Sequence, residues 1–235
     1  MTDHTVRAYD TDITTLRTML ASMGGMAEEQ LDNAITALAR RDVVLADQVI
    51  LRDDQIDKLE REIEERAILT IAKRQPMALD LREIMVAIRV SSDIERIGDL
   101  AKNTAKRTHA ISEALPRRLS AGLSRMGAMA QGQLKCVLDA YARKDDVEAM
   151  AVWRSDEELD ALYNSIFREL LTYMMEDPRN ISLCTHLLFG AKNLERIGDH
   201  TTNIAENIHY LIHGKTISEG RPKKDVTSMM TAEVK

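Results

Sequence analysis

Apolar residues recur at every third or fourth position along most of the chain, the spacing that places side chains on one face of an α-helix. The segment 10–40 shows the pattern clearly. Its apolar stripe consists of Ile13, Leu16, Leu20, Met23, Ala27, Leu31, Ala34 and Leu38. We predict a long amphipathic helix here, followed by comparable helices over about 42–74 and 79–111.

Capping residues and prolines mark where these helices begin and end. Asp42 precedes the second segment and suits a helix N-cap, because its carboxylate accepts a hydrogen bond from an otherwise unpaired backbone N–H. Gln75 precedes Pro76, and a residue before proline avoids the helical backbone conformation, so we expect the second helix to end there. Pro116 marks the next break.

The pattern then starts again. The motif Met-Ala-x-x-Gln-Leu occurs at 26–31 and recurs 103 residues later at 129–134. The pentapeptide Glu-Arg-Ile-Gly-Asp at 95–99 recurs 100 residues later, at 195–199. The small difference falls in the turn around Pro76 in one unit and Pro178 in the other, where loop length changes easily. Two matches at nearly one offset indicate a duplicated unit of about 100 residues.

The expected fold class is therefore all-α: tandem duplicated antiparallel three-helix bundles with six long helices. The helices of the second unit are expected over about 119–143, 145–176 and 179–213. The predicted organisation is a first three-helix repeat at 1–114, a second at 115–214 and a flexible C-terminal tail at 215–235.

Composition supports this interpretation and limits the function. Only 3% of the 235 residues are aromatic, and Met, Leu, Ile and Ala supply the core, which favours helices over a β-sandwich or barrel. The net charge of −6, with both signs interspersed, argues against a nucleic-acid partner. No apolar run approaches the roughly 20 residues of a membrane span, and the N-terminus lacks a signal pattern. Cys136 and Cys184 are expected to be buried free thiols, so we predict a cytoplasmic protein without membrane insertion.

Four pairs of acidic residues share one spacing, with four positions from the first member to the second. They are Asp53 with Asp57 and Glu95 with Asp99 in the first repeat, and Asp156 with Asp160 and Glu195 with Asp199 in the second. Residues at this spacing lie on one helical face about one turn apart. If the second and third helices of a repeat pack antiparallel, the four carboxylates of that repeat converge.

A single such pair is usually solvated or neutralised by a nearby basic residue, such as Arg96 or Arg196. The recurrence of four pairs beside the apolar stripes favours a cation role, because clustered carboxylates without a counter-cation repel one another. Ligand sets made only of oxygen favour hard ions such as Mg, Mn, Ca or ferric iron. We predict no catalytic residue and no cofactor-binding residue beyond these metal ligands.

Two other acidic patterns carry less weight. Residues 53–57 fit the Asp-Asp-x-x-Asp pattern of prenyl-diphosphate enzymes, but the second repeat has Ser155 before Asp156, and aromatic residues are too few to shield a carbocation. Glu206-x-x-His209 fits half of a di-iron carboxylate motif, but the first repeat has Lys106 in place of the glutamate. His109 and His209 are expected to be polar residues near helix ends.

The duplicated acidic pairs and the two Glu-Arg-Ile-Gly-Asp copies, followed by Asn103 and Asn203, resemble those of the PhoU family of phosphate-signalling regulators. The likeness extends to about Gly214. By this resemblance the eight carboxylates bind metal ions or clusters, with Asn103 and Asn203 as supporting residues. The expected metal is Mg, Mn, Fe or Zn, and the expected assembly is a homodimer.

The resemblance also implies a function that periodicity and spacing do not show. The family is non-enzymatic and represses the phosphate-starvation response when phosphate is abundant. It is expected to link the ATPase of a phosphate ABC importer to a membrane sensor histidine kinase. The residues alone leave two alternatives open, a metal-dependent helical-bundle enzyme (phosphohydrolase or oxidase) and a metal store. Against an enzyme, no nucleophile or general base recurs in both repeats beyond the ligands themselves.

Overall fold

The structure is a computed structural model of the chain and describes residues 2–111 and 117–221. Six long helices account for most of them. They are α1 (Thr2–Arg40), α2 (Val43–Arg74), α3 (Leu79–Arg107), α4 (Arg117–Arg143), α5 (Asp146–Glu176) and α6 (Ile181–His213), with short 3-10 turns η1 (Thr108–Ala110) and η2 (Pro178–Asn180). No residue in the two described ranges forms a strand. The predicted all-α fold of duplicated three-helix bundles is confirmed, although α1 begins earlier than expected.

The two repeats turn from their first helix into their second in the same way. Arg41 after α1 and Lys144 after α4 have positive φ angles of 57° and 53°, a left-handed conformation that ends a helix. Asp42 and Asp145 then cap α2 and α5, each carboxylate accepting a backbone N–H three residues later, at 2.9 and 3.1 Å. Because both pairs are 103 positions apart, the duplication extends to backbone conformation.

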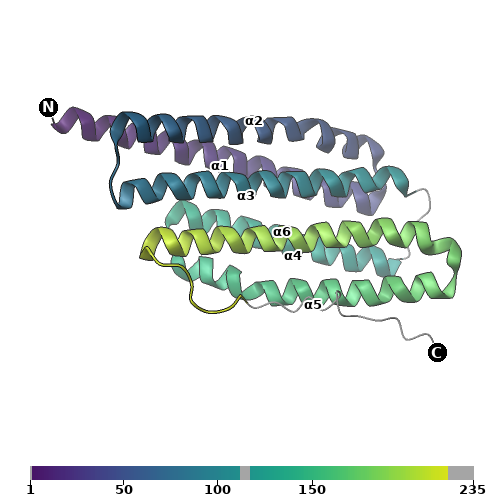
Figure 1. The fold of residues 1–235 in the computed structure, drawn as a ribbon. Coiled ribbons are helices and arrows are strands. Elements are labelled where there is room, and N and C mark those ends of the chain that lie inside the picture. The colour runs from purple at the N-terminus through teal and green to yellow at the C-terminus, as the bar shows by residue number, and fades with distance from the viewer. Residues whose placement is uncertain (1, 112–116, 222–235) are drawn as a thin grey trace.

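The two bundles pack side by side through four of the six helices. α3 lies against α6 and α1 lies against α4, whereas α2 and α5 lie on the outer sides (Figure 1). α3 and α6 run antiparallel: Arg82 near the start of α3 donates to the carbonyl of Leu211 near the end of α6, at 3.3 Å. Farther along, Asp93 is hydrogen-bonded to His200 at 2.9 Å.

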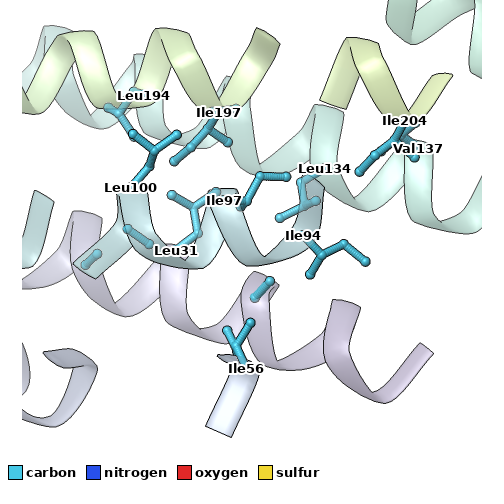
Figure 2. Close-up of a cluster of buried hydrophobic side chains, with 14 of the residues drawn as sticks. Leu31, Ile56, Ile94, Ile97, Leu100, Leu134, Val137, Leu194, Ile197 and Ile204 are labelled. Carbon is cyan, nitrogen blue, oxygen red and sulfur yellow. The ribbon is translucent and has the colours of Figure 1, made fainter. Parts of the chain in front are cut away.

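Buried apolar side chains of α1, α2, α3, α4 and α6 form one continuous cluster, part of which Figure 2 shows. They include Leu31, Ile56, Ile94, Ile97, Leu100, Leu134, Val137, Leu194, Ile197 and Ile204, all of them buried. A fully buried side chain of this kind contributes about 1.5–3 kcal/mol relative to an exposed one. The hydrophobic core is therefore continuous between the two repeats. A single repeat by itself would leave part of this apolar surface exposed.

Glycines at equivalent positions let α1 and α4 approach closely. A Cβ atom at Gly127 of α4 would lie 2.7–2.9 Å from three side-chain atoms of Ile35 on α1. At the matching position, a Cβ atom at Gly24 of α1 would lie 2.9 Å from the side chain of Leu138 on α4. Both pairs follow the 103-residue offset, so each repeat places one aliphatic side chain over a glycine of the other.

One expectation about the cysteines is wrong. Cys184 is buried, but Cys136 is exposed. Cys136 follows buried Leu134 by two positions, a rotation of about 200° around the helix, so it points away from the core. None of the described helices has both the length and the apolar character needed to cross a membrane.

Replacing Gly127 by alanine should destabilise the fold. Overpacking against Ile35 costs about 1–3 kcal/mol, of which the better helix propensity of alanine returns up to about 1 kcal/mol. Gly132, on the same helix with nothing within 4 Å of an added Cβ, is the matched control. Gly132→Ala should raise the free energy of unfolding by up to about 1 kcal/mol. Urea unfolding measures both variants, and equal stabilities would contradict the close α1–α4 contact.

Candidate metal centres

The first acidic cluster lies between the outer helix α2 and the central helix α3. α2 supplies Asp53 and Asp57, and α3 supplies Glu95 and Asp99. Asp53 is only 1% exposed, which is unusual for a carboxylate and demands a compensating partner. The antiparallel packing predicted from the sequence therefore does bring the two pairs of this repeat to one helix interface.

The surroundings of Gly98 explain why the repeated pentapeptide contains a glycine. A Cβ atom there would lie 3.1 Å from Ile56 and 3.5 Å from a carboxylate oxygen of Asp53. Its counterpart Gly198 faces Leu159 still more closely, and a Cβ there would lie 3.3 Å from a carboxylate oxygen of Asp156. The glycines thus bring the backbone of the third helix against the acidic face of the second.

A basic group and an amide partly compensate the charge of the first cluster. The Lys102 ammonium forms a short ion pair with Asp53 and lies 2.7 Å from Oδ1 of Asp99, so it bridges α2 and α3. Gln30 of α1 donates to Oδ1 of Asp53 at 2.8 Å and to the carbonyl of Gly98 at 3.1 Å. Burial alone would lower the pKa of Lys102, but its hydrogen bonds to the two carboxylates raise that pKa and keep the amine charged.

The other two carboxylates of this cluster are less well compensated. Burial raises the pKa of Asp57, and the neighbouring charge of Asp53 raises it further. Burial likewise raises the pKa of Glu95, although Arg96 opposes the shift from 3.4 Å away. The pKa values of both groups are therefore higher than usual because negative charge is crowded in a poorly hydrated place.

The second acidic cluster lies between α5 and α6 and is the more buried of the two. Its members Asp156 and Asp160 are each 2% exposed, and Glu195 is 4% exposed. Burial raises the pKa of Asp156, and Arg221 partly offsets this. The Arg221 guanidinium lies 3.1 Å from Asp156 and 2.9 Å from Asp199, so it bridges α5 and α6.

Glu195 has an incompletely satisfied carboxylate. Oε1 lies 2.9 Å from the Lys192 ammonium, whereas Oε2 is buried and accepts no hydrogen bond from the described residues. Burial raises the pKa of Glu195 to about 7, more than Lys192 lowers it, and the charges of Asp199 and Asp160 add to the rise. A buried carboxylate oxygen without a donor fits a cation ligand, because a cation satisfies it without supplying a proton.

The eight predicted ligands thus form two interface clusters, but neither cluster closes around one point. No three of these carboxylates bring oxygen atoms within 4.8 Å of one another. Lys102 and Arg221 stand between the acidic side chains instead. The donor set suits a hard ion, and the assignment of the eight residues as metal ligands stays a prediction.

The sequence analysis did not identify several residues that contact the two clusters. The amide of Gln30 was signalled by its place in the repeated Met-Ala-x-x-Gln-Leu motif, and Gln133 in the second copy donates to the Ser155 hydroxyl at 3.0 Å. Lys102 lay one turn from Asp99, but its counterpart is Thr202, so no repeat pattern marked it.

Arg221 carried no sequence signal, because it lies in the predicted flexible tail. Within the described part of that tail, Ile217 packs against the core and Arg221 reaches the second cluster. Residues 222–235 lie outside the described residues. Asn203 donates to Asp93 at 3.2 Å, which places it at the α3–α6 contact between the repeats.

Comparison with known proteins agrees with this fold. Two copies of a three-helix bundle in one chain define the class as a duplicated all-helical protein. A family model described as "PhoU domain" matches residues 20–108 and 123–208, one match in each repeat. The chain belongs to the PhoU family.

Curated relatives resemble the chain over almost its whole length. A Rhizobium meliloti protein named "Phosphate-specific transport system accessory protein PhoU homolog" is 53% identical over 228 residues, covering 97% of this chain and 96% of its own. A Caulobacter vibrioides protein of the same name is 52% identical over 229 residues, covering 97% of this chain and all of its own. These names describe an accessory protein of a transport system, in agreement with the prediction that the chain is not an enzyme.

Solved structures show the same architecture. The crystal structure of PhoU from Pseudomonas aeruginosa superposes with a TM-score of 0.85 at 40% identity, covering 88% of this chain and all of that chain. The phosphate transport system regulatory protein PhoU from Streptococcus pneumoniae gives 0.83 at 27% identity, covering 90% of this chain and all of its own.

The raised pKa of Glu195 predicts a pH effect on metal-free protein. Between pH 4.5 and about 7 the folded state holds a proton that the unfolded state releases, so stability falls as pH rises through this window. Glu195→Gln should remove that contribution and flatten the decline in the free energy of unfolding of chelator-treated protein. Exposed Glu158 on α5 provides the control Glu158→Gln. If the free energy of unfolding of Glu195→Gln varied with pH as that of the wild type does, the raised pKa of Glu195 would be contradicted.

Proposed function

We propose that the chain regulates phosphate uptake and phosphate signalling from the cytoplasm, as a metal-braced adaptor. In this proposal it links the ATPase of a phosphate ABC importer to a sensor histidine kinase and represses the phosphate-starvation response when phosphate is abundant. The observation that carries the proposal is membership of the PhoU family, together with relatives named as accessory proteins of a phosphate-specific transport system.

An adaptor needs exposed surface that a partner can bury, and the turns between the second and third helices provide some. Met77 and Leu79 at the α2–α3 turn are 81% and 64% exposed. In the second repeat, Met175 and Ile181 flank the corresponding turn and are 64% and 49% exposed. Exposed apolar side chains at these turns support a role in protein contact, either with the transport and signalling partners or in a homodimer.

The metal-bracing part of the proposal rests on the charge of the two clusters. In each cluster, carboxylates that are buried or partly buried lie between an outer helix and a central one. Lys102 in the first and Arg221 in the second show where positive charge is required, and Oε2 of Glu195 still lacks a hydrogen-bond donor among the described residues. A Mg, Mn, Fe or Zn ion held by these oxygens would fix the spacing of the helix pair.

Removing one carboxylate from each cluster should lower metal binding. Asp99→Ala combined with Asp199→Ala should reduce the Mg, Mn or Fe retained by protein purified without chelator to less than about a tenth, because each acidic cluster loses a charged ligand. The control combines Asp54→Ala with Glu158→Ala, two exposed residues whose loss changes the net charge equally. Elemental analysis decides, and the metal assignment fails if both double variants retain wild-type metal.

Deleting the gene should derepress phosphate-uptake genes in phosphate-rich medium, because the proposed repressing contact is lost. A reporter fused to a phosphate-starvation promoter measures the effect. Complementation with the wild type should restore repression, as should the Asp54→Ala, Glu158→Ala control. Normal repression in the deletion strain would refute the regulatory role. Full repression by the Asp99→Ala, Asp199→Ala variant would instead separate regulation from metal bracing.

A further inference from the structure

A third group of ligating side chains lies outside both acidic clusters, where α5 begins and α6 ends. Asp146 is the first residue of α5, and His209 and His213 stand one turn apart near the end of α6. His209 lies ten residues beyond Asp199, about 15 Å farther along the helix axis. The group is thus separate from the second acidic cluster, and its chemistry does not depend on that cluster.

The geometry of this group is compact. Nδ1 of His209 lies 2.8 Å from Oδ1 of Asp146, and Nε2 of His213 lies 2.9 Å from Oδ2 of the same carboxylate. The two imidazole rings are 4.4 Å apart between centroids. One atom from each residue lies within 4.8 Å of the other two, a condition that no other His, Cys, Asp or Glu group meets among the side chains described in residues 9–111 and 119–221.

We propose that Asp146, His209 and His213 bind a borderline transition-metal ion of the zinc type. Two imidazole nitrogens and one carboxylate oxygen form a ligand set that zinc prefers, with a fourth position left for water. Histidines four positions apart on a helix project to one side and are a recurrent zinc-binding spacing. The oxygen-only acidic clusters suit harder ions, so the two kinds of site select different metals.

Little rearrangement separates the hydrogen-bonded arrangement from a metal-bound one. Ligand atoms at roughly 2.0–2.2 Å from a tetrahedral ion lie about 3.3–3.6 Å from one another. The present separations of 2.8 and 2.9 Å would therefore open by less than about 1 Å. The side chains of Asp146, His209 and His213 are 28%, 23% and 46% exposed, so an ion reaches them from solvent.

Charge favours the same site. Burial alone would raise the pKa of Asp146, but hydrogen bonds with His213 and His209 outweigh it and hold that pKa below its usual value. The carboxylate is therefore ionised at neutral pH. It also stands at the positive N-terminus of α5, whereas the histidines stand at the negative C-terminal end of α6.

A purely structural role is the competing explanation, because an aspartate bonded to two histidines also ties the two helix ends together. The first repeat contains such a simpler arrangement: His109, the counterpart of His209, lies 2.9 Å from Asp47. No third ligand joins that pair among the described residues. The first repeat thus supplies a matched internal control, one imidazole and one carboxylate in place of two imidazoles and one carboxylate.

The test is calorimetric titration of chelator-treated full-length protein with Zn²⁺, in excess Mg²⁺ that competes for the oxygen-only sites. The wild type should bind one Zn²⁺ ion that His213→Gln and Asp146→Asn bind at least about tenfold more weakly. His109→Gln should behave like the wild type. Titration with Co²⁺ should give a visible ligand-field spectrum that changes in the same two variants.

Circular dichroism establishes that each variant is folded, and two substitutions at different helices guard against loss of structure at one of them. The inference is overturned if the wild type binds no Zn²⁺ under these conditions. It is equally overturned if folded His213→Gln and Asp146→Asn bind Zn²⁺ with wild-type stoichiometry and affinity. The double variant Asp99→Ala, Asp199→Ala should still bind this ion. The zinc titration therefore tests the third site even if the acidic clusters bind no metal.

Discussion

Carboxylates buried between two packed helices require positive charge close by, and this requirement shapes both repeats. An ionised side chain deprived of water is costly unless a counter-charge and hydrogen bonds replace its hydration. Gly98 and Gly198 bring about this burial of charge, because they let the third helix approach the acidic face of the second. Lys102 and Arg221 supply part of the required positive charge.

The two repeats place a basic residue beside their buried carboxylates in different ways. In the first, Lys102 lies on the same helix as Asp99 and one turn away, so its charge belongs to the bundle itself. In the second, Thr202 occupies the equivalent position and Arg221 reaches in from the segment after α6. The second cluster therefore depends on a tail contact that the first does not need, even though the helices that carry the two clusters are duplicates.

The chain separates two kinds of ligand chemistry in space. Oxygen-only clusters occupy the middle of the helix pairs, where burial raises the pKa values of Glu95, Asp156 and Glu195. Imidazole and carboxylate ligands meet at the end of one pair, where solvent has access and the helix termini favour the charges present. An ion at either place would tie two helices together, and in the second repeat both places join α5 to α6.

The sequence by itself determined the helices, their duplication and which acidic residues share a face, because these follow from local periodicity. Asp42 as a cap and Gln75 as a helix end also came from local rules, and the structure agrees. Only the tertiary structure decided which groups stand between the carboxylates. Lys102, Gln30 and Arg221 come to Asp53 or Asp156 from distant parts of the chain. Their approach depends on how whole helices pack, which no spacing along the chain encodes.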